Sequence, residues 1–327
     1  MRLVVVGIGA IGGVVGGFLA HAGREVVLVA RGAQHAAIAE GALHVESPAG
    51  RFTVRARVVD SAARVDWRDG DVAVLAVKTQ DAEAALIEIA AAAPDVVVMC
   101  LTNGVEAERL ALRRLPAVYA ACVMMPASFL VPGVVQTWVS PIPGVIDLGR
   151  YPAGRDAVAE AIAAELVAAG FASEVRADAM AWKRAKLLMN VGNAIDALCG
   201  RAARFGALAQ LADQARAEAL ACFAAAGLAC TEAAEFDARV ALAAARPIAG
   251  AKRTGGSTWQ SLARGARTLE TDYLNGESAL LGRLHGVATP VNVALQRVAA
   301  EAARRGEAPG SVAASELERR VAALIGL

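Results

Sequence analysis

Two kinds of hydrophobic pattern divide the chain. In the first half, short apolar runs alternate with helical stretches, a pattern typical of a parallel sheet covered by helices. After Asp178 nearly every stretch has the periodicity of a helix. We therefore predict an α/β Rossmann domain with a doubly wound, mainly parallel sheet over residues 1–177, and an all-α domain over residues 178–327. No long flexible linker separates them, so we expect a ligand cleft at their junction.

The individual elements follow from the same pattern. Strands are expected at residues 3–6, 26–29, 72–77, 96–100, 118–124 and 172–175, with a further β stretch, punctuated by Pro and Gly, at residues 128–148. Helices are expected around residues 18–20 and at residues 81–92, 106–115, 157–169, 179–198, 207–226, 231–245, 269–285 and 291–305. A short amphipathic helix is expected in the tail after Gly306.

A glycine-rich turn follows the first strand and precedes the first helix, with the spacing of a dinucleotide-binding βαβ unit. Gly7 permits the tight turn, Gly9 lets a pyrophosphate approach the backbone, and Gly12 lets the helix pack on the sheet. The helix N-terminus offers unpaired N–H groups to the phosphates. The predicted cofactor contacts of this turn are Gly7, Ile8, Gly9, Ala10, Ile11 and Gly12.

The residues after the second strand select between the two dinucleotides. An NAD site usually has Asp or Glu there, to accept hydrogen bonds from the ribose 2′-OH. This chain has Ala30 and Arg31 instead. A guanidinium suits a 2′-phosphate, which it can pair in two places. A solvated loop arginine is the alternative interpretation, but the missing acid and the present cation both favour NADP.

Composition and charge exclude several classes of function. The net charge of +1 gives no electrostatic footprint for nucleic acid. The five cysteines are odd in number and lack CxxC spacing, so we predict no disulfide framework, no metal site and a reduced, cytoplasmic location. Residues 3–20 are apolar enough to resemble a signal peptide or a membrane span, but glycines interrupt them, and we predict no membrane insertion.

Polar side chains follow two predicted strands of the first domain. Lys78 comes directly after the strand that ends at Val77, and Asn103 follows the strand that ends at Cys100. In a doubly wound sheet, ligands lie beyond the carboxyl ends of the strands. Lys78 can meet a cofactor phosphate or ribose, and the Asn103 amide can bind nicotinamide, ribose or substrate. The alternative is ordinary loop chemistry, since Asn-Gly is a common turn pair.

One face of the first helix of the second domain is polar. At 100° per residue, Lys186, Asn190 and Asn193 fall within about 60° of one another. The face either meets solvent or lines a polar cleft. The two amides are poor helix formers, which favours the cleft. Lys183 lies about 60° from Lys186 and is the rival candidate for a catalytic lysine.

Two further polar residues attract attention only in context. Ser257 follows two glycines, and Glu270 stands near a predicted helix start. Taken alone, Ser257 is explained as a helix cap and Glu270 as an acid that compensates a helix dipole.

Together these motifs resemble the ketopantoate reductase family, the 2-dehydropantoate 2-reductases, over nearly the whole chain. The order and spacing of the motifs are more specific than any one of them. They are the glycine turn, Arg31, Lys78, Asn103-Gly104-Val105, Lys186-x-x-x-Asn190, the serine–glutamine segment from Ser257 to Gln260, Glu270-x-Asp272-x-x-Asn275-Gly276 and the stretch from Gly286 to Asn292.

The resemblance implies an NADP-binding Rossmann domain and a helical domain of the 6-phosphogluconate-dehydrogenase type. It implies that NADPH reduces a small 2-oxo acid, most notably ketopantoate, to a 2-hydroxy acid. Hydride reaches the carbonyl carbon while charge builds on the carbonyl oxygen. By the resemblance, Lys186 stabilises that charge and gives the proton, as the general acid.

The resemblance also implies the substrate contacts. Asn190 helps to bind the substrate, Ser257 contacts its carboxylate, and Glu270 hydrogen-bonds to the substrate, helps to hold the lysine and is counted among the cofactor contacts. We add Asn103 and Asn193 to the predicted substrate set. The chain departs from the family pattern where Asn193 replaces an amide expected one residue later, and where Arg204 and Thr254 replace expected asparagines. A different 2-oxo acid therefore stays open.

Two other classes of function stay open as well. A related dehydrogenase acting on a 3-hydroxy acid or an opine-type substrate is expected to differ at the lysine, the Asn103 loop and the Glu270 segment. A non-catalytic NADP(H) sensor is expected to bind nucleotide tightly without turnover. The sequence leaves the oligomeric state open, a homodimer included.

Overall fold

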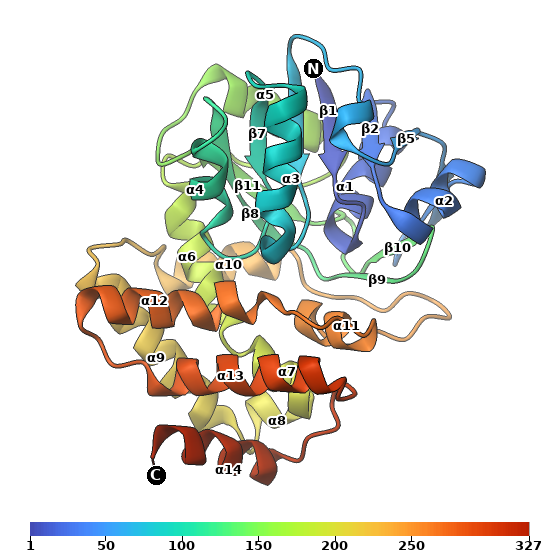
Figure 1. Ribbon diagram of the computed structural model, residues 1–327. Helices are drawn as coiled ribbons and strands as arrows, with labels where there is room; N and C mark the ends of the chain where they lie inside the picture. The colour runs from blue at the N-terminus through green and yellow to red at the C-terminus, as the bar shows by residue number, and fades with distance from the viewer. Residues whose placement is uncertain (327) are drawn as a thin grey trace. The chain divides into compact units, whose positions relative to one another are not determined.

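The computed structural model of the protein describes residues 1–326 (Figure 1). The described chain forms two compact units, and neither is fully continuous in sequence. The first unit comprises residues 1–183 and 232–253, and the second comprises residues 184–231 and those from 254 onward. The chain therefore leaves the first unit after Lys183, returns at Glu232 and leaves it again after Arg253.

A large sheet forms the centre of the first unit. Among the described residues it has seven strands in the order β5-β2-β1-β6-β7-β8-β11. Neighbouring strands are parallel except β11, which is antiparallel to β8. Counted along the chain, the parallel strands have the order 3-2-1-4-5-6, which is that of dinucleotide-binding sheets. The strands are β1 (Arg2–Val6), β2 (Val26–Val29), β5 (Arg57–Val59), β6 (Asp71–Leu75), β7 (Val97–Cys100), β8 (Val118–Met124) and β11 (Val145–Arg150).

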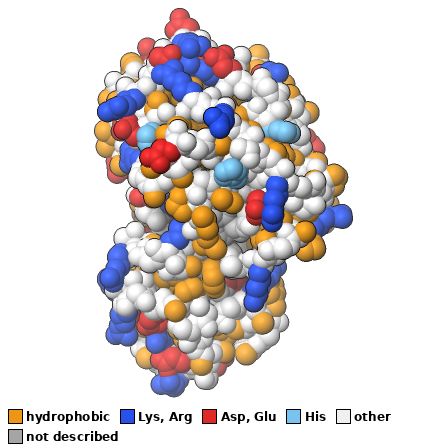
Figure 2. All heavy atoms as spheres, turned by 90° about the vertical axis from the view of Figure 1, so that its right-hand side faces the viewer, with side chains coloured by type: hydrophobic (Ala, Val, Ile, Leu, Met, Phe, Trp, Pro, Cys, Tyr) orange, Lys and Arg blue, Asp and Glu red, His pale blue; other side chains and the backbone are white. Residues whose placement is uncertain are grey.

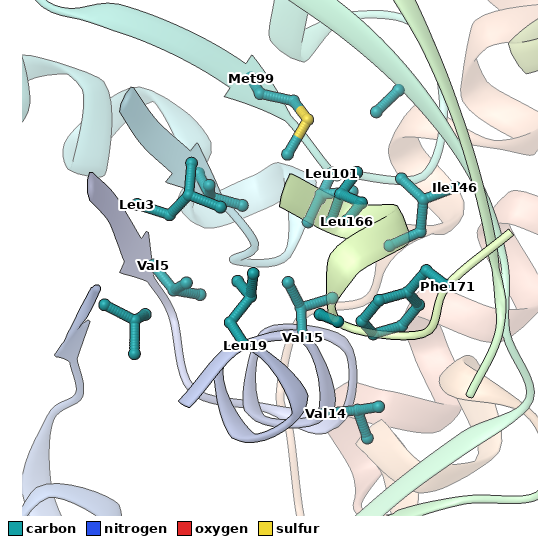
Figure 3. Packing of buried hydrophobic residues seen from close by; sticks show 14 of the residues in the cluster. Leu3, Val5, Val14, Val15, Leu19, Met99, Leu101, Ile146, Leu166 and Phe171 are labelled. Atoms are coloured by element: carbon teal, nitrogen blue, oxygen red, sulfur yellow. The ribbon is translucent and has the colours of Figure 1, made fainter. Parts of the chain in front are cut away.

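Alternate residues of the central strands face two different hydrophobic layers. Leu3 and Val5 belong to the layer that also holds α1 and α5, and Figure 3 shows Val5 beside Leu19 of α1. Val4 and Val6 belong to the layer that holds α3 and α4. Because both faces are covered, these strands are continuous apolar runs. The helices are α1 (Ala10–His21), α3 (Thr79–Ala92), α4 (Ala107–Leu112) and α5 (Ala157–Ala168).

A smaller sheet packs against α1. Its strands have the order β4-β3-β10-β9, and β3 pairs in parallel with β10. A Cβ added at Gly13 would lie 2.5 Å from Val135, and one at Gly17 would lie 2.5 Å from Val45, so the glycines let this sheet approach the helix closely. The sequence analysis predicted the β stretch that holds β9 and β10 but did not predict β3 and β4. The strands are β3 (Leu43–Ser47), β4 (Gly50–Val54), β9 (Ala127–Val131) and β10 (Val134–Thr137).

Residues 232–253 belong to the first unit, although the sequence analysis placed them with the helical half. The physical reason is the buried carboxylate of Asp147 on β11, which accepts two hydrogen bonds from Arg239, at 3.0 and 2.6 Å. Arg239 lies on α10 (Ala233–Ala241). The main-chain N–H of Arg246 also donates to the carbonyl of the residue after β10, at 2.6 Å. The predicted boundary at residue 177 stays a prediction.

The second unit is built from helices. Its core includes three residues of the apolar face of α13, Val291, Leu295 and Val298, each of which is buried. With the mainly parallel Rossmann sheet, this confirms the predicted fold class. The helices are the last part of α6 (Ala179–Asn190), α7 (Asn193–Cys199), α8 (Arg201–Phe205), α9 (Ala209–Ala225), α11 (Ser257–Ala263), η2 (Glu270–Tyr273), α12 (Asn275–His285), α13 (Pro290–Arg305) and α14 (Ala314–Ile325).

The surface carries charges of both signs. Figure 2 shows acidic and basic side chains interspersed on one face of the protein. Several charged side chains of the protein form ion pairs at the surface, such as Arg155 with Glu160. Within the described residues, each helix is too short or too polar to cross a bilayer.

Candidate functional site

The glycine turn after β1 has the geometry that the sequence predicts. Gly7 has φ of +100°, a conformation that side-chain-bearing residues avoid, and a Cβ there would lie 2.9 Å from the Val77 nitrogen. A Cβ at Gly12 would lie 2.1 Å from the Gly7 carbonyl oxygen, so only glycine fits where α1 meets the turn. Gly9 differs, because a Cβ there would have no neighbour within 4 Å. The space above Gly9 is open.

The N-terminus of α1 begins at this open position. Gly9 is the N-cap residue, no side chain caps the helix, and its first turn holds no acid. The first N–H groups of a helix lack intrahelical partners and carry the positive end of the dipole. An anion approaching Gly9 therefore meets main-chain donors and a favourable field.

Arg31 stands where the sequence predicts a cation, directly before α2 (Gly32–Glu40). Its Nη2 donates to Oε2 of Glu88 on α3, at 2.8 Å. The Arg31 side chain is 65% exposed and that of Glu88 is 27% exposed. An exposed pair of this kind contributes at most about 1 kcal/mol, so an incoming phosphate can compete for the guanidinium.

The loops that carry Lys78 and Asn103 are brought together. They follow β6 and β7, which are neighbours in the sheet. Lys78 is the N-cap residue of α3, and the next residue, Thr79, donates from Oγ1 to the Asn103 carbonyl at 3.0 Å. Lys78 and Asn103 are both half-buried. The glycine turn follows β1, which pairs with β6, so these predicted contacts share one edge of the sheet.

Lys183, the rival lysine, has a structural partner inside the first unit. It is 3% exposed, its Nζ donates to the Thr102 carbonyl at 3.1 Å, and it forms an ion pair with Glu108 on α4, which is fully buried. Burial raises the pKa of the neighbouring Cys100 thiol well above its ordinary value; Glu108 raises it further, and Lys183 opposes that rise. The Lys183 ammonium is thus committed to Glu108 and to the loop after β7.

The prediction of a single helix over residues 179–198 is wrong, because α6 ends at Asn190 and α7 begins at Asn193. Side chains take the carbonyls freed at this break. Arg204 Nη2 donates to the Met189 carbonyl at 2.6 Å, and Asn275 Nδ2 donates to the Val191 carbonyl at 2.8 Å. Lys186 and Asn190 both lie within α6, whereas Asn193 belongs to α7, so a single helical wheel no longer fixes its direction relative to them.

Gly192 leaves room for the Arg204 guanidinium at the break. A Cβ there would lie 2.3 Å from the Arg204 guanidinium, which also donates to Asp196 at 3.1 Å. Arg204, which stands where the family pattern leads us to expect an asparagine, therefore holds the junction of α6 and α7. Lys186 is half-buried and Asn190 is buried.

Ser257 and Glu270 are positioned by short helices. Ser257 is the first residue of α11, and the N-cap is Gly256 without a side-chain bond, so the interpretation of Ser257 as a cap is wrong. Glu270 begins η2 and is only 3% exposed. A carboxylate that merely compensates a helix dipole needs no burial, so the burial of Glu270 argues for a more specific role.

A buried amide pair, which sequence reasoning left without a role, supports this region. Asn275 donates from Nδ2 to Oδ1 of Asn292 at 3.0 Å, and both side chains are fully buried. Asn292 Nδ2 donates to Glu218 at 2.8 Å, and Glu218 accepts the main-chain N–H of Val291 at 2.9 Å, which caps α13. Their place in the family motifs was the available signal, and the structure makes them a support for the α6–α7 junction.

Within residues 1–326, no group of three or more His, Cys, Asp or Glu side chains is arranged to hold a metal ion.

Comparisons with known proteins give the family. The model of ketopantoate reductase PanE/ApbA matches residues 3–152, and the model of its C-terminal part matches residues 178–303. A 2-dehydropantoate 2-reductase of Halobacterium salinarum is 30% identical over 295 residues, which is 89% of this chain and 95% of that protein.

Solved structures agree with this assignment. A PanE/ApbA family ketopantoate reductase from Ralstonia eutropha superposes with a TM-score of 0.78 at 26% identity, covering 94% of this chain and 100% of that one. D-mandelate dehydrogenase, solved with NADH and anilino(oxo)acetate, shares the fold with a TM-score of 0.79 at 22% identity, covering 94% and 99% of the two chains. Because the two family models together span most of its length, this chain belongs to the ketopantoate reductase family.

Proposed function

We propose that this chain is an oxidoreductase that uses NADPH to reduce a 2-oxo acid to a 2-hydroxy acid, with 2-dehydropantoate as the leading substrate. The observation that carries the proposal is the open, uncapped N-terminus of α1 at Gly9, within a sheet of the dinucleotide-binding order. Relatives named 2-dehydropantoate 2-reductase support the reaction class.

The first unit has the residues to hold the cofactor. We assign the pyrophosphate to the main chain of residues 7–12, where an anion is favoured and where Gly9 leaves room. Arg31 is the proposed partner of the 2′-phosphate. Lys78 and Asn103, at the ends of neighbouring strands, are the proposed contacts to the ribose and nicotinamide side. When bound, NADPH supplies a hydride.

Lys186 is the proposed general acid. As the carbonyl carbon of the 2-oxo acid gains a hydride, its oxygen gains negative charge and takes a proton from the Lys186 ammonium. Two observations support this choice over Lys183: Lys183 is buried against Glu108, whereas Lys186 is half-buried. Glu270, a buried carboxylate of the same unit, is the proposed partner that holds the lysine and the substrate.

Three further polar residues of the second unit are the proposed substrate contacts. Asn190 is buried at the end of α6, Asn193 opens α7, and Ser257 opens α11. Asn103 joins this set from the first unit in the proposal. A homodimer and a cytoplasmic location remain predictions of the sequence.

A second candidate substrate is another 2-oxo acid with a different side chain. The observation that favours it is Arg204, which is engaged with Asp196 and the Met189 carbonyl at the α6–α7 junction instead of offering an amide. D-mandelate dehydrogenase, a protein of the same fold, is named for a 2-hydroxy acid with an aromatic side chain.

The test is NADPH oxidation, followed by absorbance, with ketopantoate and a panel of aliphatic and aromatic 2-oxo acids. We expect turnover with ketopantoate, or with another member of the panel if the second candidate is correct. Lys186→Ala should lower kcat about 10²- to 10⁴-fold while NADPH binding persists. Lys252→Ala, which removes an exposed lysine, is the matched control. A fully active Lys186→Ala variant contradicts the assignment of the acid, and tight NADPH binding without turnover of any acid indicates a sensor.

A further inference from the structure

The loop after β7 is held by two buried side chains of the first unit. Lys183 Nζ donates to the Thr102 carbonyl at 3.1 Å, and Thr79 Oγ1 donates to the Asn103 carbonyl at 3.0 Å. Lys183 and Thr79 are 3% and 1% exposed, so water does not compete for either bond. The two carbonyls flank the Cα of Asn103. The backbone from which the Asn103 side chain departs is therefore fixed on both sides.

Glu108 explains how a lysine comes to be buried at this point. An ammonium withdrawn from water needs a paired counter-charge, and the fully buried Glu108 carboxylate supplies it. Gly104, the next residue in the loop, has φ of +72°. Asn-Gly turns are adaptable by themselves. The buried side chains thus fix the backbone of a loop segment whose own sequence would leave that backbone adaptable.

We infer that Thr79, Lys183 and Glu108 are positioning residues, which hold the Asn103 side chain in place for NADPH and the 2-oxo acid. The inference rests on the proposed function, in which Asn103 contacts cofactor or substrate. Lys183 acts through the main chain of the loop and not on the reacting oxygen, so the two lysines of α6 have separate tasks. A shift of about 1 Å in a group that positions reactants lowers a rate by about a hundredfold.

Thr79→Val is the sharpest single test, because it removes one hydroxyl at nearly constant volume. Thr137→Val is its matched control: Thr137 is also buried in the first unit, and its Oγ1 also donates to a carbonyl, that of Pro143, at 2.6 Å. We expect Thr79→Val to raise the Kd of NADPH about three- to tenfold and to lower kcat in the same sense. Thr137→Val should leave both constants at the wild-type values.

A double-mutant cycle with Asn103→Ala separates positioning from general stability. If Thr79 acts through Asn103, Thr79→Val has no further effect on either constant once the Asn103 side chain is gone. Thermal unfolding of the single variants checks that the two valine substitutions cost similar stability. The binding cycle uses NADPH fluorescence and does not depend on turnover.

The ion pair is tested by replacing both partners, so that no charge is left buried and unpaired. We expect the double variant Lys183→Met/Glu108→Leu to bind NADPH more weakly, as Thr79→Val does. The pH dependence of its residual kcat should be unchanged. Loss of one limb of that pH profile would make Lys183 the acid and overturn the inference.

Two further results overturn it: an effect of Thr79→Val no larger than that of Thr137→Val, or an undiminished effect in the Asn103→Ala background. Wild-type protein that binds NADPH but turns over no 2-oxo acid refutes the proposed function instead, and the binding cycle still decides the inference.

Discussion

Replacing Asp147 by Asn is expected to destabilise the first unit strongly. The Asp147 carboxylate is fully buried and accepts four hydrogen bonds from two arginines, at 3.1 and 2.9 Å from Arg176 and at 3.0 and 2.6 Å from Arg239. It also accepts the main-chain N–H of Glu174 at 3.1 Å. The amide keeps the volume but removes the charge that both guanidinium groups face.

The size of the effect follows from the burial of the partners. Removing one member of a buried ion pair costs about 3–5 kcal/mol. The side chains of Arg176 and Arg239 remain 19% and 11% exposed, and both also contact Glu174, so they keep some solvent and one carboxylate. We therefore expect the lower end of that range, about 3 kcal/mol.

The assay is urea unfolding followed by tryptophan fluorescence. Three of the four tryptophans, Trp67, Trp138 and Trp182, lie in the first unit, and the fourth lies in the second. The Arg176 guanidinium sits 4.2 Å from the centre of the Trp182 ring, so most of the signal reports the first unit. With a slope of about 3 kcal/mol/M, a loss of about 3 kcal/mol moves the midpoint down by about 1 M.

Glu174→Gln is the matched control, because Glu174 contacts the same two arginines at 2.8 Å but is 52% exposed. An exposed pair contributes about 1 kcal/mol or less, so the control should shift the midpoint by no more than about 0.3 M. Equal shifts for the two variants, or a loss below about 1 kcal/mol for Asp147→Asn, would refute the reasoning that burial sets the strength of these ion pairs.

Three further predictions concern the first unit. Gly9→Ala should leave the thermal midpoint of unfolding unchanged but weaken NADPH binding, because its Cβ enters open space where we place the pyrophosphate. Gly12→Ala should lower the thermal midpoint, because its Cβ meets a backbone oxygen at 2.1 Å. Calorimetry and NADPH titration test the pair, and the opposite assignment of the two effects contradicts this reasoning. Arg31→Ala should weaken the binding of NADPH far more than that of NADH. Glu88→Gln should strengthen NADPH binding about two- to fivefold at low salt, because it releases Arg31. Equal changes in the binding of both nucleotides would remove the 2′-phosphate argument. Burial, together with a hydrogen bond to a carboxylate, raises the pKa of Tyr119 from 10.0 to about 12, so the stability it contributes is complete below pH 10 and is lost between pH 10 and 12. Tyr119→Phe should remove that part of the pH dependence of unfolding.

The parts of the fold that sequence predicts well are those with local causes. The strand–turn–helix unit at the start depends on contiguous apolar residues and on glycines at fixed spacing, so its pattern alone identifies it. The β3–β4 hairpin was missed, although β3 alternates buried and more exposed residues from Leu43 to Ser47. A short strand of this kind is stabilised by its partner β10, which lies about ninety residues farther along the chain.

The candidate site shows the same limit. Gly9 and Arg31 could be proposed from the sequence because the roles predicted for them depend on neighbours in sequence. The pairing of Lys183 with Glu108, across 75 positions, depends on the tertiary fold and is invisible to periodicity. The break between α6 and α7 was missed for a similar reason, because distant side chains of Arg204 and Asn275 satisfy its carbonyls.

The discontinuity of the first unit has a consequence for synthesis. A ribosome that has released only the residues up to 183 has delivered every strand of the large sheet but not Arg239, the second cation of the Asp147 carboxylate. The nucleotide-binding half therefore reaches its final set of contacts only after residues 184–231 have emerged from the exit tunnel. A fragment that stops before Glu232 lacks the Arg239 contacts to Asp147, so we expect the first unit expressed alone to gain stability when residues 232–253 are supplied with it.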